Sequence, residues 1–134
     1  MKTFFRAGFV THLSLVVLIS VGAYLGALPT SLPDLPHFDK LGHAVLIGGL
    51  AFFLDGALEQ RRLFAGLAFP RLGPALVVLV AGTEEYLQRL SPRRSSDLAD
   101  FAADVIGVCF FAWLSRRIVE ARAARGVERA AALG

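Results

Sequence analysis

Four long apolar stretches alternate with short polar segments along the chain. They cover about residues 9–28, 39–58, 72–90 and 97–119. Each has roughly the 20 residues that an α-helix needs to cross the hydrocarbon core of a bilayer. The pattern therefore predicts an all-α protein, an integral membrane four-helix bundle that forms one domain over residues 1–134.

The composition agrees with this interpretation. Hydrophobic residues make up 55% of the chain and charged residues only 19%, which is more apolar surface than a soluble domain of 134 residues could bury. The net charge of +3 is compatible with nucleic-acid binding, but the basic residues stand between and after the apolar stretches, as topology signals do. No nucleic-acid partner is therefore expected.

The basic residues also predict the orientation of the helices. If all four stretches span the membrane, ten Lys and Arg residues fall on the side of the two termini and four on the other side. Because loops rich in Lys and Arg stay in the cytoplasm, both termini are expected there, in a multi-pass protein of the bacterial cytoplasmic membrane. The basic tail, residues 120–134, is expected to lie at the membrane surface or to fray.

Polar side chains gather at the opposite ends of three of the apolar stretches. Ionisable groups in a membrane cost about 2.5 to 3.5 kcal/mol each, so they are candidates for function. The spacings are helical: i, i+4 in the second and third stretches, and steps of three and four in the fourth. Three polar faces are thus expected to meet in a common pocket on the extracytoplasmic side, formed by Asp39, Lys40, His43, Glu84, Gln88, Arg93, Arg94, Asp97, Asp100 and Asp104.

Several local roles follow from the same segments. Asp39 is a candidate N-cap of the second helix, and Ser96 or Asp97 of the fourth. Glu84 and Glu85 cannot face the same way, and the spacing of Glu84 to Gln88 favours Glu84 as the residue that faces the cluster.

Other residues have expected structural roles. Asp55 is expected to pair with Arg61 or Arg62 near the inner end of the second helix. Gly107 would allow another backbone to approach closely, and Gly22 with Gly26 forms a GxxxG pair that could do the same.

The polar pattern resembles that of the VanZ family. It reads Asp39-Lys40-x-x-His43, then Glu84-Glu85-x-x-Gln88, then Arg93 or Arg94 followed by Asp97-x-x-Asp100-x-x-x-Asp104-x-x-Gly107. The resemblance implies a small four-helix membrane protein, in a family whose founding member is associated with teicoplanin resistance. Two positions depart from the family pattern: Asp104 stands where Asn is usual, and Ala44 where an aromatic residue often follows the histidine.

The first functional hypothesis is recognition or modification of an anionic lipid-linked envelope component at the outer leaflet. Arg93, Arg94 and Lys40 would hold phosphate or carboxylate groups. His43 with Glu84 or Asp97 would act as acid and base if the protein is an enzyme, a question that the sequence leaves open. The catalytic candidates are His43, Glu84, Asp97 and Asp100, and the binding candidates are Asp39, Lys40, Gln88, Arg93, Arg94 and Asp104.

Two alternatives remain. A carboxylate and histidine cluster could hold a divalent metal, with Mg, Ca or Mn favoured by the oxygen ligands and Zn permitted by His43; the metal candidates are Asp39, His43, Glu84, Asp97 and Asp100. The other alternative is a non-catalytic accessory or assembly subunit of an envelope or polysaccharide system, in which the polar cluster only holds the helices together. No cofactor is expected, and assembly into a homo-oligomer is left open.

Overall fold

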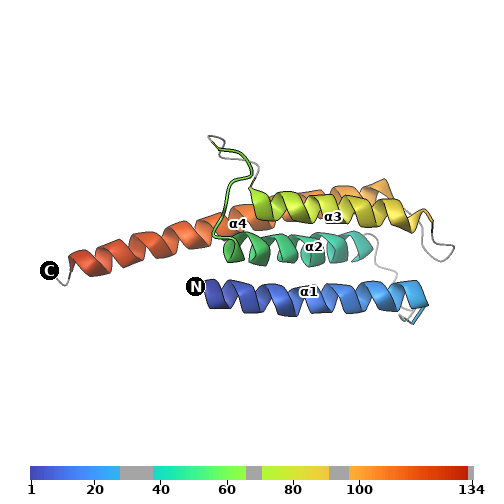
Figure 1. Ribbon diagram of the computed structural model, residues 1–134, viewed down its shortest axis with the longest axis horizontal. Helices are drawn as coiled ribbons and strands as arrows, with labels where there is room; N and C mark the ends of the chain where they lie inside the picture. The colour runs from blue at the N-terminus through green and yellow to red at the C-terminus, as the bar shows by residue number, and fades with distance from the viewer. Residues whose placement is uncertain (28–37, 66–70, 91–96, 133–134) are drawn as a thin grey trace.

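The computed structural model describes residues 1–27, 38–65, 71–90 and 97–132. These residues form four α-helices: α1 (Lys2–Leu25), α2 (Phe38–Ala57), α3 (Leu72–Gln88) and α4 (Leu98–Ala131). Consecutive helices run in opposite directions, so α1 and α3 are parallel to each other and antiparallel to α2 and α4 (Figure 1). The all-α, four-helix prediction is confirmed. Of the described helices, α1, α2 and α4 are long and apolar enough to cross a membrane, whereas α3 has 17 residues.

The helix ends differ from those expected. α1 begins at Lys2 instead of residue 9 and ends at Leu25, because Gly26 takes a left-handed conformation with φ of 70° and caps the helix. Gly26 therefore has a capping role, and a Cβ atom there would meet no atom of the described chain within 4 Å. α2 begins at Phe38, so Asp39 lies in the first turn and is not the N-cap.

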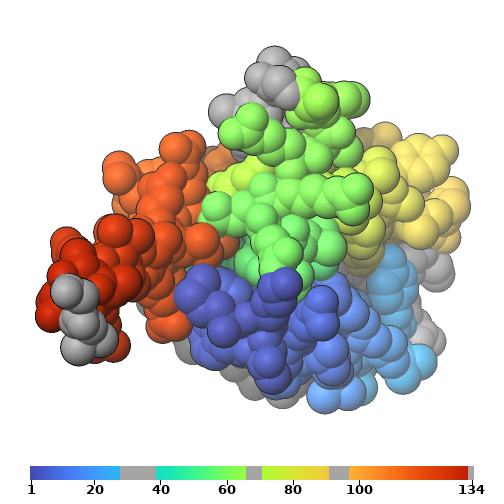
Figure 2. Space-filling model, turned by 60° about the vertical axis from the view of Figure 1, so that its left-hand side comes forward, coloured from blue at the N-terminus to red at the C-terminus, as the bar shows by residue number. Residues whose placement is uncertain are grey.

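α4 continues far beyond the expected end at residue 119. Its final third is helical to Ala131 and projects past the other three helices (Figure 2). The prediction that the tail frays is therefore wrong. Alanine, arginine and glutamate favour helix, and Arg116 donates to Glu120 one turn later at 2.7 Å. We call residues 119–131 the basic extension.

α2 is the central helix and contacts all three others. It packs most extensively against α4, where small residues allow the backbones to approach: a Cβ atom at Gly48 would lie 2.8 Å from the backbone carbonyl of Gly107. A Cβ atom at Gly107 would lie 2.7 Å from the Cα of Ala44. The expected close approach at Gly107 is thus present.

α1 packs against α2 but not against the backbones of α3 or α4 within the described ranges. Phe5 is buried next to Gly56, and Phe53 lies over Gly8, so each helix offers a glycine to an aromatic ring of the other. Near the middle of α1, the Nε2–H of His12 donates to the carbonyl oxygen of Leu46 at 2.9 Å. This half-buried hydrogen bond helps to fix the register of α1 against α2.

A buried ion pair joins the helices at the end of the bundle where α2 finishes and α3 begins. Arg71 donates to the fully buried Asp55 at 2.5 Å and to the carbonyl oxygen of Ala112 in α4 at 2.7 Å. Asp55 therefore pairs with Arg71, not with Arg61 or Arg62 as expected, which are both exposed. Spacing along the chain favoured the nearer arginines, but Leu72 donates to the carbonyl oxygen of Arg61 at 2.8 Å, so Arg71 also lies next to this part of the chain. We call this end of the bundle the basic end.

Candidate functional site

The opposite end of the bundle, where α1 and α3 finish and α2 and α4 begin, carries most of the predicted site residues. We call it the polar end (Figure 1). Each helix contributes polar side chains from the turn nearest this end. The contacts between them fall into three groups.

The first group surrounds Lys40. Its Nζ donates to three carboxylates: Asp100 at 3.0 Å, Asp97 at 3.2 Å and its neighbour Asp39 at 3.4 Å. Two of these partners belong to α4 or its N-cap, so the contacts connect the start of α2 to the start of α4. The positive charge of Lys40 is thus already surrounded by negative groups.

The second group is a histidine and carboxylate pair deeper in the bundle. The Nδ1 of His43 lies 3.2 Å from Asp104, which is 4% exposed, and its Nε2 lies 4.0 Å from Asp100. An ionised carboxylate can only accept, so with Asp104 ionised the Nδ1 atom carries the proton of this hydrogen bond. A carboxylate on one ring nitrogen orients the imidazole, an arrangement that suits a general acid or base.

The third group involves the two adjacent glutamates of α3, which face different ways. Glu84 accepts from the hydroxyl of Tyr24 at 3.3 Å and from the amide of Gln88, a buried residue. Glu85 is 5% exposed and accepts from the backbone N–H of Asp97 at 2.6 Å. Glu84 lines the cavity between α1 and α3, whereas Glu85 holds the beginning of α4.

Asp97 is the N-cap of α4, where it accepts from the N–H of Ala99 at 2.8 Å. This hydrogen bond, and after it the ammonium of Lys40, hold the pKa of the Asp97 carboxyl below its usual value of 3.8. A lowered pKa means that the folded state favours the ionised form. The stabilising contribution of Asp97 is therefore present above that usual value and is lost as the pH falls through the lowered pKa.

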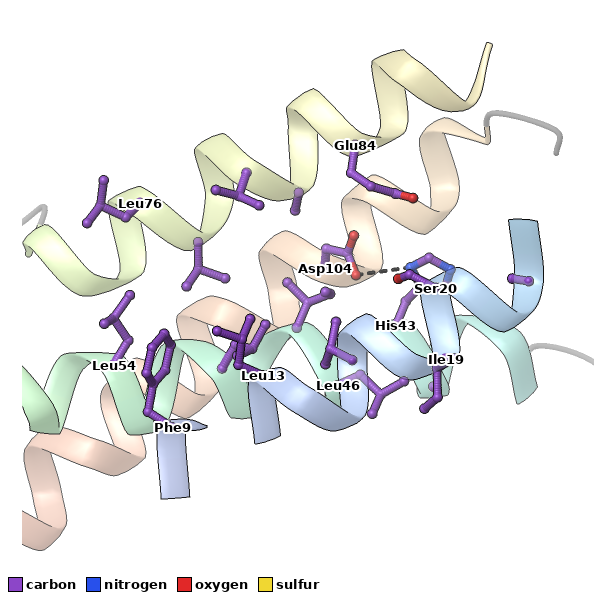
Figure 3. Close-up of a pocket in the computed structure, with 18 of the residues that line it drawn as sticks. Phe9, Leu13, Ile19, Ser20, His43, Leu46, Leu54, Leu76, Glu84 and Asp104 are labelled. Atoms are coloured by element: carbon purple, nitrogen blue, oxygen red, sulfur yellow. Dashed lines mark hydrogen bonds and ion pairs between the residues drawn. The ribbon is translucent and has the colours of Figure 1, made fainter. Parts of the chain in front are cut away.

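A cavity of about 410 Å³ opens beside these groups (Figure 3). It lies between α1 and α3, with α2 along its floor. Its polar lining residues are Ser20, Asp39, His43, Glu84 and Asp104, and the labelled ones gather toward one end of the view. The rest of the lining is apolar, running down to Phe9, Leu54 and Leu76.

Carboxylates outnumber cations at the described polar end. Lys40 is the lysine there, and it contacts three of the carboxylates. Arg93 and Arg94, which were expected to supply positive charge, lie outside the described residues. Within the described ranges, no group of three or more His, Cys, Asp or Glu side chains is arranged to hold a metal ion.

The structure brings Asp39, Lys40, His43, Asp97, Asp100 and Asp104 into one network between α2 and α4, with Glu84 and Gln88 on the α3 side of the cavity. The contribution of α1 was not predicted from the sequence. Ser20 and Tyr24 are the polar residues of the 15–28 part of the first apolar stretch and lie four apart, a spacing that places them on one helix face. That signal would have identified α1 as the fourth wall of the site.

No protein-family model matches the chain, and neither a characterised protein nor a solved structure is significantly similar to it. The resemblance to the VanZ family therefore rests on the residue pattern alone.

Proposed function

We propose that the chain is a multi-pass protein of the bacterial cytoplasmic membrane, with both termini in the cytoplasm and the polar end at the outer face. Three apolar helices of sufficient length support insertion. The orientation is supported by the arginines of the basic extension and by the exposed Arg61 and Arg62 at the basic end.

In this orientation, the proposed function is recognition of a lipid-linked component of the cell envelope, in line with the VanZ resemblance. The observation that carries the proposal is the cavity between α1 and α3, which is apolar along most of its wall and polar at its outer end. Such a cavity matches an amphiphile whose head lies among Asp39, His43 and Glu84. A link to glycopeptide resistance would follow from binding of a cell-wall precursor.

The charges at the polar end favour a particular kind of head. Carboxylates only accept hydrogen bonds, so Glu84 and Asp39 suit the hydroxyl groups of a sugar better than a bare phosphate. Lys40 already contacts three carboxylates, which leaves it less available to an anion than the sequence alone indicated. In the proposed complex, Arg93 and Arg94 hold the phosphate.

His43 adds a capacity for acid–base chemistry. Its ring lines the cavity, and Asp104 on Nδ1 sets its orientation. If the bound component is modified, His43 is the group that would take or give a proton, with Asp104 in place of the expected Glu84 or Asp97 as its carboxylate partner.

A second candidate function is that of a non-catalytic accessory subunit. It is favoured by the pairing of the cluster between helices: Lys40 with Asp100, His43 with Asp104, and the Asp97 amide with Glu85. In that case the polar network serves only to hold α2, α3 and α4 together.

Binding of lipids that share a tail but differ in the head tests the proposed function. Native mass spectrometry would compare glucosyl polyprenyl phosphate, polyprenyl phosphate and polyprenol on the purified protein in a detergent without a sugar head. We expect the glucosylated lipid to bind most tightly. Glu84→Gln should weaken it by about tenfold, because an amide replaces a charged acceptor, a loss of about 1.4 kcal/mol.

Glu120→Gln is the matched control, since it makes the same change at an exposed position outside the site. It should leave all three affinities unchanged. Equal binding of the three lipids to the wild-type protein, with no effect of Glu84→Gln, would contradict recognition of the head and favour the accessory function.

A further inference from the structure

The apolar part of the cavity is a groove that opens sideways. Val80 lines it and is nevertheless 66% exposed, and Leu13 and Leu76 line it while remaining 38% and 41% exposed. The backbones of α1 and α3 do not contact each other within the described ranges, so the opening lies between these two helices. In a bilayer this opening would face the hydrocarbon, and a lipid chain could enter without passing through water.

Tyr24 crosses the groove at its polar end. Its hydroxyl reaches from α1 and donates to Glu84 of α3 at 3.3 Å. Farther from the polar end, the lining residues Val16, Leu50 and Val77 are apolar. The groove thus has one polar end, bridged by Tyr24, and one long hydrocarbon-like section.

The groove is longer than one leaflet. Its α2 lining runs from Asp39 to Leu54, and that interval of a helix spans about 22 Å. Half of a hydrocarbon core of about 30 Å is about 15 Å, so the groove continues past the middle of the bilayer. The acyl chains of an ordinary outer-leaflet lipid end near the middle, and would leave its inner section unfilled.

We propose that this groove binds a single polyisoprenoid chain, which enters between α1 and α3 and extends from the polar end past the middle of the membrane. The inference rests on the proposed function and identifies the tail of the lipid that the polar end recognises. The cavity volume of about 410 Å³ lies in the usual range of ligand sites, about 300 to 1,000 Å³.

Filling the groove with a bulky side chain tests this proposal. Val80 and Leu79 are adjacent on α3 and equally exposed, at 66% each, but only Val80 lines the groove. Val80→Trp should weaken binding of a long polyprenyl phosphate by tenfold or more, whereas Leu79→Trp should leave it within twofold. Both changes place the indole on an exposed surface, so both variants should fold.

A second pair on α1 makes the same comparison from the other wall. Val16 lines the groove and its neighbour Val17 is 51% exposed outside it. Val16→Trp should weaken binding of the same lipid, and Val17→Trp should not. Agreement between the two pairs places the chain between α1 and α3, while an effect of either control as large as that of its partner would overturn the assignment.

Lipids with one phosphate head and different tails identify the chain. Long polyprenyl phosphate should bind at least tenfold more tightly than farnesyl phosphate or hexadecyl phosphate, because only the long chain fills the inner section. Equal binding of hexadecyl phosphate would show an acyl site and overturn the polyisoprenoid assignment. Dimerisation lost in Val80→Trp, without any lipid effect, would assign the groove to a second copy of the chain.

The two proposals can fail separately. If Val80→Trp has no effect on lipid binding but Glu84→Gln still weakens binding of the glucosylated lipid, only the assignment of the groove is wrong. If Val80→Trp weakens binding of all lipids with a long tail and Glu84→Gln weakens binding of none, the groove holds the chain but the polar end does not recognise the head.

Discussion

Asp55 and Arg71 show how one residue pair can join three helices. Asp55 is fully buried in α2, and Arg71 at the start of α3 contacts both Asp55 and the Ala112 carbonyl of α4. If either charge is removed alone, the other charged group stays buried without its partner. A single substitution in the pair should therefore lower the stability of the fold strongly, whereas replacing both residues by apolar ones should lower it little.

We expect Arg71→Met to lower the free energy of unfolding by about 3 to 5 kcal/mol, because the Asp55 carboxylate is left buried without its partner. Asp55→Leu combined with Arg71→Met should recover most of that loss. The measurement is unfolding in mixed micelles by titration with sodium dodecyl sulfate. Arg62→Met, an exposed arginine on the same connection, is the control and should cost little. A double variant as unstable as Arg71→Met alone would contradict this account.

At the scale of the helices, the closest packing lies between α2 and α4. Gly48 and Gly107 face each other there, and Phe111 covers Gly48. Backbones that approach this closely leave no space for a methyl group, and the neighbouring atoms belong to backbone that cannot easily move. The two helices that carry most of the polar network are thereby held in fixed register.

Gly107→Ala should destabilise the protein by about 1 to 3 kcal/mol, because the added Cβ forces α2 and α4 apart. Gly126→Ala is the matched control: nothing lies within 4 Å of that position, and alanine favours a helix over glycine by about 0.5 to 1 kcal/mol. Thermal unfolding in detergent distinguishes the two. A Gly107→Ala variant that melts like the wild-type protein would show that the α2–α4 contact is looser than described.

The sequence predicted the number and approximate positions of the helices, because each apolar stretch has a length set by the bilayer. It did not predict the ends of α1 and α4, since hydropathy marks the part that can lie in hydrocarbon and not where the helix stops. Lys2, Arg6 and the arginines of the basic extension are polar but favour helix.

Periodicity indicated which residues of α2, α3 and α4 share a face, and the structure places those faces at one end. It could not identify the partners, which depend on the rotation of each helix about its axis. Asp104 rather than Glu84 or Asp97 lies against His43, and Tyr24 of α1 contacts Glu84. The groove was not foreseen, because it results from the separation of the α1 and α3 backbones within the described ranges, a property of the packing.

At the scale of the whole molecule, the charges are divided between two ends. Most carboxylates of the described chain lie at the polar end, and the arginines of the basic extension project from the other (Figure 2). α4 has 34 residues and is therefore about 51 Å long, well beyond a hydrocarbon core of about 30 Å. In the proposed membrane arrangement, about 20 Å of this helix lies outside the hydrocarbon, and the positions of the arginines favour the basic extension as that part.

Single cysteines test this arrangement of the molecule in the membrane. In a Cys109→Ser background, Ala124→Cys on the basic extension should react with a membrane-impermeant maleimide in inside-out vesicles and not in intact spheroplasts. Leu98→Cys at the polar end, a residue that is 71% exposed, should show the reverse. The native Cys109 is exposed on the helix surface and lies about 17 Å along α4 from that end. The proposed arrangement puts it in the hydrocarbon, so the wild-type protein should react slowly from both sides. Rapid labelling of Ala124→Cys in spheroplasts would mean that the basic extension faces outward, and would move the polar end, with its carboxylates, to the cytoplasmic side.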